Sequence, residues 1–197
     1  MTSGTSQAEP TAERIACTVY APDRPPERLV ALDRISTVLE KSASLVWLDV
    51  VNPAADDFLL IEEEFSLHPL AVEDAIKAHQ RPKIEAYGDG WFIVVKAATR
   101  DGESLQIHDL SIFAGARYIV TVRTDPTYPL VEIAQRWEHP GVALAKNSGS
   151  LLYTILDVVV DGYMQIAEAF EDRVEALEAA LFGREARTSD VLLQSST

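Results

Sequence analysis

Positive charge and cysteine are both scarce in this chain. Lys and Arg total 17 against 31 Asp and Glu, a formal net charge of −14 over 197 residues. A surface this acidic repels phosphate backbones and favours cations, so nucleic acid is not an expected partner. Cys17 is the only cysteine, which excludes a disulfide within the chain and is typical of a reducing compartment. It lies in an alternating apolar segment and is expected to be a small core side chain.

Long hydrophobic runs are missing as well. Crossing a bilayer takes about 18 apolar residues, and the run around Val158–Val160 is interrupted by Asp157 and Asp161. The N-terminus has no basic region followed by an apolar one, so no signal peptide is expected. We therefore expect the chain to be soluble by itself, and its 47% hydrophobic content is enough for a substantial core.

The distribution of apolar residues predicts an α/β fold. Strands are expected over Ile15–Tyr20, Arg28–Asp33, Leu45–Asp49, Trp91–Ala98, Leu105–Phe113 and Tyr118–Val122, and helices over Ser36–Lys41, Pro53–Phe65, Pro69–Ala78 and Thr127–Trp137. Asp101-Gly102 is a hairpin signal between two of the strands, and Asn52-Pro53 is a helix start signal. Together they predict a mixed β-sheet sandwiched between helices (α/β/α) over residues 14–145, after a polar, disordered tail over 1–13.

Residues 146–197 have a different pattern, which predicts one long helix. From Ser150 the apolar residues recur every three or four positions: Leu152, Leu156, Val159, Tyr163, Ile166, Phe170, Val174, Leu177 and Leu181. A helix of about 30 residues would be roughly 45 Å long. Gly183 is expected to end it as a C-terminal cap. A helix of this length should project from the domain and pack against another long helix.

The long helix also carries many acidic residues beside its apolar seam. They are Asp157, Asp161, Glu168, Glu171, Asp172, Glu175 and Glu178. Two interpretations stay open, a solvated acidic face or a cation-binding surface. The second is chemically reasonable because Mg²⁺ takes oxygen ligands, commonly one or two carboxylates with several waters retained.

Little else in the sequence carries chemistry. Asp89 lies between Gly88 and Gly90, where an aspartate commonly caps the backbone of a turn. The four histidines have no zinc-ligand spacing, and surface or capping roles are expected for them. Aromatics such as Trp91 and Phe92 are expected in the core. Since no nucleophile–base arrangement is recognisable, the chain is not expected to be an enzyme.

One segment resembles a known family. It contains His68-Pro69-Leu70, then Glu73-Asp74, then Gln80-Arg81-Pro82-Lys83-x-Glu85, and finally the apolar strand Trp91–Lys96. In order and spacing this string is similar to the cytoplasmic domain of the CorA family of divalent-cation transporters, with weaker similarity over roughly residues 40 to 182.

The resemblance implies that the chain is a soluble fragment of a longer transporter, whose stalk and two membrane helices would follow Thr197. It also implies a cytoplasmic location at the face of the cell membrane. The family's Gly-Met-Asn pore motif is absent, as a fragment that stops before the membrane requires. The full-length protein would be a homopentamer that transports Mg²⁺ or Co²⁺, while the fragment is expected to be monomeric or weakly associated.

The resemblance further implies regulatory divalent-cation sites between subunits. By alignment, Asp89 matches an acid in the turn and Asp172 matches an acid on the long helix. Both are candidate Mg²⁺ ligands. Weaker candidates are Glu168, Glu171 and Glu175. Gly88 departs from relatives that carry a second acid at its position, so the site would have one ligand fewer.

Three other functions stay open at this point. The same domain of a ZntB-like zinc transporter looks similar at this level, so Zn²⁺ replaces Mg²⁺ in that alternative. From a different class, the chain could be a free-standing acidic module that binds a helical partner. A metal-dependent hydrolase is the least supported, because Glu73, Asp74 and Asp89 lack a base–nucleophile arrangement.

Overall fold

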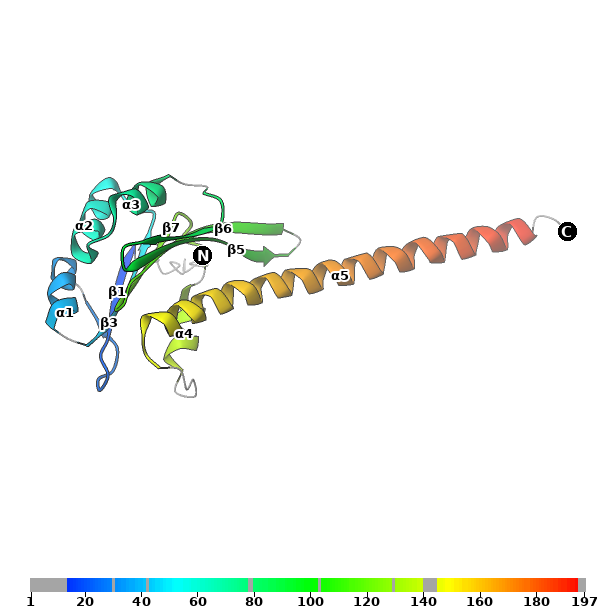
Figure 1. Cartoon of the computed structure of the whole chain (residues 1–197). Helices are drawn as coiled ribbons and strands as arrows, with labels where there is room; N and C mark the ends of the chain where they lie inside the picture. The colour runs from blue at the N-terminus through cyan, green and yellow to red at the C-terminus, as the bar shows by residue number, and fades with distance from the viewer. Residues whose placement is uncertain are drawn as a thin grey trace, which may run out of the picture.

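The structure, a computed structural model, describes residues 14–29, 31–41, 43–77, 80–102, 104–128, 130–139 and 145–194, with the backbone alone over 182–194 (Figure 1). The expected disordered tail lies outside the described residues. The elements in chain order are β1 (Ile15–Tyr20), β2 (Glu27–Arg28), the 3-10 helix η1 (Leu32–Arg34), α1 (Ile35–Lys41), β3 (Leu45–Val51), α2 (Ala55–Phe65), α3 (Pro69–Ile76), β4 (Lys83–Tyr87), β5 (Gly90–Asp101), β6 (Ser104–Ala114), β7 (Tyr118–Arg123), α4 (Leu130–Glu138) and α5 (Ser148–Gln194).

The strands form one mixed sheet of seven in the order β2-β1-β3-β7-β6-β5-β4. The β3–β7 pair is parallel and the other neighbours are antiparallel. The hairpin predicted at Asp101-Gly102 is confirmed, since Asp101 pairs with Ser104 and Gly102 takes a φ of 57°. β4 pairs only with the first part of β5, up to Val94. Among the residues that the structure describes, the rest of β5 therefore has no strand on that side.

Helices cover both faces of the sheet, so the predicted α/β/α fold is confirmed (Figure 1). On one face, α1–α3 pack on alternate strand residues such as Val46 and Leu48. On the other face, α4 and the first part of α5 pack on residues such as Trp47 and Ile119. The alternation of side chains along each strand thus supplies two separate apolar cores.

The N-terminal part of α5 belongs to the second core and stays in contact with β5 as far as Tyr163, while the part beyond Phe170 projects into solvent (Figure 1). Asn147 caps the helix, its Oδ1 accepting a hydrogen bond from the Ser150 N–H at 2.9 Å. Leu151, Ile155 and Val159 are buried, whereas every side chain over 171–181 is exposed. The projection predicted from the sequence is confirmed. The predicted seam is therefore divided into a buried and an exposed half.

The expected end of the helix at Gly183 is wrong, because α5 continues to Gln194. A glycine permits the left-handed conformation of a C-cap but does not require it. Inside a helix it costs only about 1 kcal/mol relative to alanine. The helix has 47 residues instead of about 30.

Two other predictions at the start of the domain are wrong. The expected strand Arg28–Asp33 is only the two-residue β2, after which the chain turns into η1, because Leu29 and Leu32 pack against the helical layer. The expected helix start at Asn52-Pro53 lies two residues too early. Asn52 has a φ of 49° and α2 begins at Ala55, where the Asp57 carboxylate accepts the Ala54 N–H at 2.6 Å.

β4 was not predicted, because its apolar residue is exposed and its charged residues are partly buried, the reverse of the usual strand pattern. Ile84 is exposed, while Lys83 and Glu85 are partly buried in an ion pair 2.9 Å long. Pairing with β5, which no local pattern reveals, makes this segment a strand. Trp91 pairs with Ala86 of β4 near the sheet edge and is 50% exposed, so its expected core position is also wrong.

One stretch of the described residues, Ser148–Leu181, is long and apolar enough to cross a membrane by length and composition. The expectation that no run meets this requirement is therefore corrected. Helices in the core of a globular domain have the same property, and Ile155 and Val158 are buried against the sheet. Burial in this core accounts for only part of the stretch, because Phe170, Val174 and Leu177 are exposed.

Cys17 is confirmed as a core residue, and its burial predicts a loss of stability in base. Burial raises the pKa of the Cys17 thiol from 9.0 to about 12. Between these values the unfolded chain releases the thiol proton and the folded chain keeps it, so the free energy of unfolding falls as the pH rises above 9. The slope is about 1.4 kcal/mol per pH unit. Urea unfolding of the wild type and of Cys17→Ala at pH 8 and pH 10 measures this contribution. It equals the change, between the two pH values, in the difference between their unfolding free energies. A difference independent of pH would contradict the expectation.

Candidate cation site and the charged groups around it

Asp89 lies in the two-residue turn between β4 and β5. Tyr87 pairs with Gly90, and Gly88 takes a φ of 59°, a conformation that favours glycine. The Asp89 side chain is exposed. The turn thus presents a single carboxylate to solvent at one end of the sheet.

Asp172 lies on the projecting part of α5 and is also exposed. The weaker candidates Glu168, Glu171 and Glu175 are exposed on the same part of the helix. Within the part of the chain that the structure describes, no three carboxylates or histidines come together to hold a metal ion. Asp172 and the three glutamates are therefore a row of separate carboxylates along one helix.

The two main candidates lie at opposite ends of β5. Asp89 precedes the first residue of this strand, while Asp172 lines a cleft with Arg100 and Ser104 at the other end. At about 3.4 Å per residue, ten residues of strand separate them by roughly 34 Å. One copy of the chain therefore does not bring the two carboxylates together, and a shared ion would need a second copy. Their chemistry suits Mg²⁺, which binds one or two carboxylates and retains its waters.

The acids at the base of α5 have a different role. Asp157 and Asp161 each accept a hydrogen bond of 2.7 Å from Arg136 of α4. Hydrogen bonds to these two carboxylates raise the pKa of Arg136 above its usual value, and the bond to Asp161 has the larger effect. Both acids are thus used inside the domain, where they tie α5 to α4.

A buried ion pair that the sequence analysis did not identify joins the parallel strands. The Asp49 carboxylate of β3 accepts hydrogen bonds from Arg123 of β7, the shortest at 2.9 Å, and another from Thr121 at 2.9 Å. Arg123 also donates to the backbone carbonyls of Pro126 and Tyr128. The sequence does show an acidic and a basic residue at the ends of two apolar strands. It does not show that these two strands are neighbours in the sheet, so the pair could not be predicted.

His108 has a buried structural role, so the expectation of a surface or capping role is wrong for it. Its side chain is 1% exposed, and its ring nitrogens lie 2.7 Å from Thr99 Oγ1 and 2.7 Å from Asp125 Oδ2. Hydrogen bonds from Thr127 and from His108 lower the pKa of Asp125 below its usual value. For His68 the expectation is confirmed, since its ring accepts the Leu70 N–H and caps α3. His79 lies outside the described residues.

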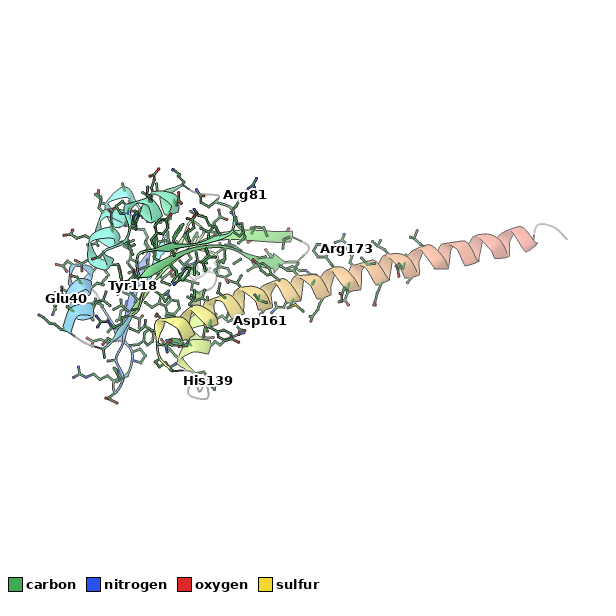
Figure 2. The ribbon with its side chains drawn as sticks, viewed as in Figure 1. Glu40, Arg81, Tyr118, His139, Asp161 and Arg173 are labelled. Carbon is green, nitrogen blue, oxygen red and sulfur yellow. The ribbon has the colours of Figure 1, made fainter. Side chains whose placement is uncertain are left out.

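A cleft of about 450 Å³ separates the tip of the β5–β6 hairpin from α5. Its walls are partly apolar, with Leu105 on the hairpin and Phe170 on the helix. Arg100, Asp172 and Arg173 supply the charged groups. Figure 2 shows Arg173 on the side of α5 near the hairpin tip. One of the two main candidate ligands thus lies among basic side chains.

Comparison with solved structures identifies the fold. The soluble domain of CorA from Methanocaldococcus jannaschii superposes with a TM-score of 0.66 and 20% identity, over 86% of this chain and 64% of that one. The ZntB cytoplasmic domain from Vibrio parahaemolyticus gives a TM-score of 0.61 and 15% identity, over 81% and 64%. The chain therefore has the fold shared by these two transporter domains.

Sequence comparison defines the family. The family described as CorA-like Mg²⁺ transporter protein matches residues 42–195. YfjQ of Bacillus subtilis, named as a metal ion transporter, is 30% identical over 73% of this chain and 44% of its own length. The cobalt/magnesium transport protein CorA of Thermotoga maritima is 26% identical over 73% and 42%. This chain belongs to the CorA-like Mg²⁺ transporter family, as the resemblance implied, and spans less than half the length of these relatives. Their names are those of transporters and not of enzymes.

Proposed function

We propose that this chain is the cytoplasmic, cation-sensing part of a transporter for Mg²⁺ or Co²⁺ that works as a homopentamer at the cell membrane. Residues 14–145 form the sensing domain, and the helical segment 146–197 leads towards the stalk and membrane region. The relatives named for magnesium and cobalt transport support the choice of cation.

The observation that carries the sensing role is the placement of Asp89 and Asp172. Both are exposed, and they lie at opposite ends of β5, so that one copy cannot use both for the same ion. Between neighbouring copies, however, the turn of one can face the helix of the next. Copies with a formal charge of −14 each repel one another, and a bound divalent cation supplies the positive charge that lowers this repulsion.

The equilibrium between packed and loosened arrangements would then depend on the cation concentration. An ion stabilises only the arrangement that binds it, in proportion to its differential affinity. Carboxylates held between copies keep the domains packed at high Mg²⁺, and at low Mg²⁺ the same carboxylates drive them apart. Gly88 offers no side-chain ligand, so each site relies on few carboxylates and a well-hydrated ion.

Protease protection of the full-length protein across a Mg²⁺ titration tests this proposal. The variant Asp89→Ala/Asp172→Ala is expected to need roughly tenfold more Mg²⁺ for half-maximal protection, the equivalent of about 1.4 kcal/mol of lost binding energy. Its unfolding free energy should stay within about 1 kcal/mol of the wild type, because both side chains are exposed.

Asp33→Ala is a control, since Asp33 is an exposed acid in η1, an element that carries neither candidate ligand. Identical titrations of the wild type and the double variant would show that these two carboxylates are not the sensor. Glu168, Glu171 and Glu175 would then be the next residues to replace.

A zinc transporter is the second candidate, because the ZntB cytoplasmic domain has the same fold. The same titration with Zn²⁺ separates the two. Protection at a much lower concentration of Zn²⁺ than of Mg²⁺, abolished in the double variant, would favour the zinc alternative.

A further inference from the structure

The cleft between the hairpin tip and α5 is lined by Asp172 and also by a positive charge from a distant part of the chain. Arg100 belongs to β5 and lines the same cleft of about 450 Å³. Its Nε donates to the Gly102 carbonyl at 2.6 Å, which holds the guanidinium group at the hairpin tip.

Neither side chain forms an ion pair within the part of the chain that the structure describes. Among the described residues, Arg100 has no carboxylate within ion-pair distance, and Asp172 has no basic group within that distance. The guanidinium group therefore faces a cleft whose acidic side chain is Asp172. Attraction between the two acts across the cleft, without a fixed ion pair.

We propose that Arg100 competes with the divalent cation for Asp172 and so sets the cation concentration at which the sensor responds. This inference rests on the proposed function, in which Asp172 is a cation ligand. A guanidinium group stays charged throughout the physiological pH range, so its competition does not depend on pH there. Sensor affinity would thus be tuned from within the chain by a residue that is not itself a ligand.

Coulomb's law gives the size of the effect. A fixed unit charge some 6–10 Å from a divalent ion in water weakens binding roughly four- to tenfold at low ionic strength. Screening shortens the range of this repulsion as salt is added, with a Debye length of about 10 Å at 0.1 M. The influence of Arg100 should therefore decrease as monovalent salt increases.

The test is the Mg²⁺ titration of protease protection in the full-length protein at low ionic strength. Arg100→Gln is expected to lower the Mg²⁺ concentration for half-maximal protection about four- to tenfold, and Arg100→Lys, which keeps the charge, to leave it near the wild type. Arg34→Gln makes the same charge change at an exposed site in η1 and should have no effect. In an Asp172→Ala background, Arg100→Gln should no longer shift the midpoint.

The outcomes separate the two proposals. If Asp172→Ala shifts the midpoint but Arg100→Gln does not, the inference is overturned and the proposed function stands. If Arg34→Gln shifts it as much as Arg100→Gln does, net charge and not the cleft is responsible, which also overturns the inference. If Asp172→Ala leaves the titration unchanged, the proposed function fails and the inference with it.

Discussion

Replacing Asp49 with alanine is expected to lower the free energy of unfolding by about 3–5 kcal/mol. Asp49 and Arg123 form a buried pair whose side chains are 12% and 8% exposed. Removing the carboxylate leaves the Arg123 guanidinium in the interior with only two backbone carbonyls as acceptors. Urea unfolding followed by circular dichroism measures the loss.

Two further variants make the reason testable. Asp49→Ala/Arg123→Met removes both charges and should recover much of the loss, since apolar replacement of a buried pair is often neutral or stabilising. Arg14→Ala breaks the pair with Asp57, in which Arg14 is 53% exposed, and should cost at most about 1 kcal/mol. A cost below 1 kcal/mol for Asp49→Ala would contradict the assignment of a buried, uncompensated charge.

Replacing Gly162 with alanine is expected to destabilise the protein by about 1–3 kcal/mol, although alanine is the better helix former. A Cβ at Gly162 would lie 2.9 Å from the backbone carbonyl oxygen of Ala98. The neighbouring Tyr163 hydroxyl donates to the Lys96 carbonyl of the same strand. Helix α5 therefore approaches the free edge of β5 so closely that a methyl group forces the two apart.

Gly149→Ala is the matched control, because it changes the same residue type near the start of α5. Its added Cβ would meet only the Asn147 Oδ1, at 3.4 Å. This variant should keep or slightly raise the unfolding free energy. The sign of the change in unfolding free energy at Gly162 is decisive. An unhindered helix glycine would give a gain of about 1 kcal/mol on replacement by alanine, and such a gain would show that the contact with Ala98 is not tight.

The α/β/α fold and most of its elements could be predicted from the sequence, because their signals are local. The short apolar run in Leu45–Val51 indicates a strand whichever neighbours it acquires, and the apolar spacing from Leu152 indicates a helix wherever it packs. The hairpin at Asp101-Gly102 depends on two residues alone. Features of this kind can be predicted because backbone geometry determines them over a few residues.

Features that depend on distant neighbours were missed. β4 is a strand because β5 pairs with it, and the end of α5 was misjudged because a glycine permits a helix to stop without requiring it. The buried role of His108 depends on Asp125, a residue from another segment.

The candidate site divides in the same way. Residue type and exposure, which the sequence indicates, make Asp89 and Asp172 acceptable Mg²⁺ ligands. Their separation by the length of β5 and the presence of Arg100 in the same cleft as Asp172 follow from the packing of α5 along the edge of the sheet. Chemistry is carried by single side chains and can be recognised from a sequence, whereas distance and electrostatic surroundings arise only when the chain folds and brings remote segments together.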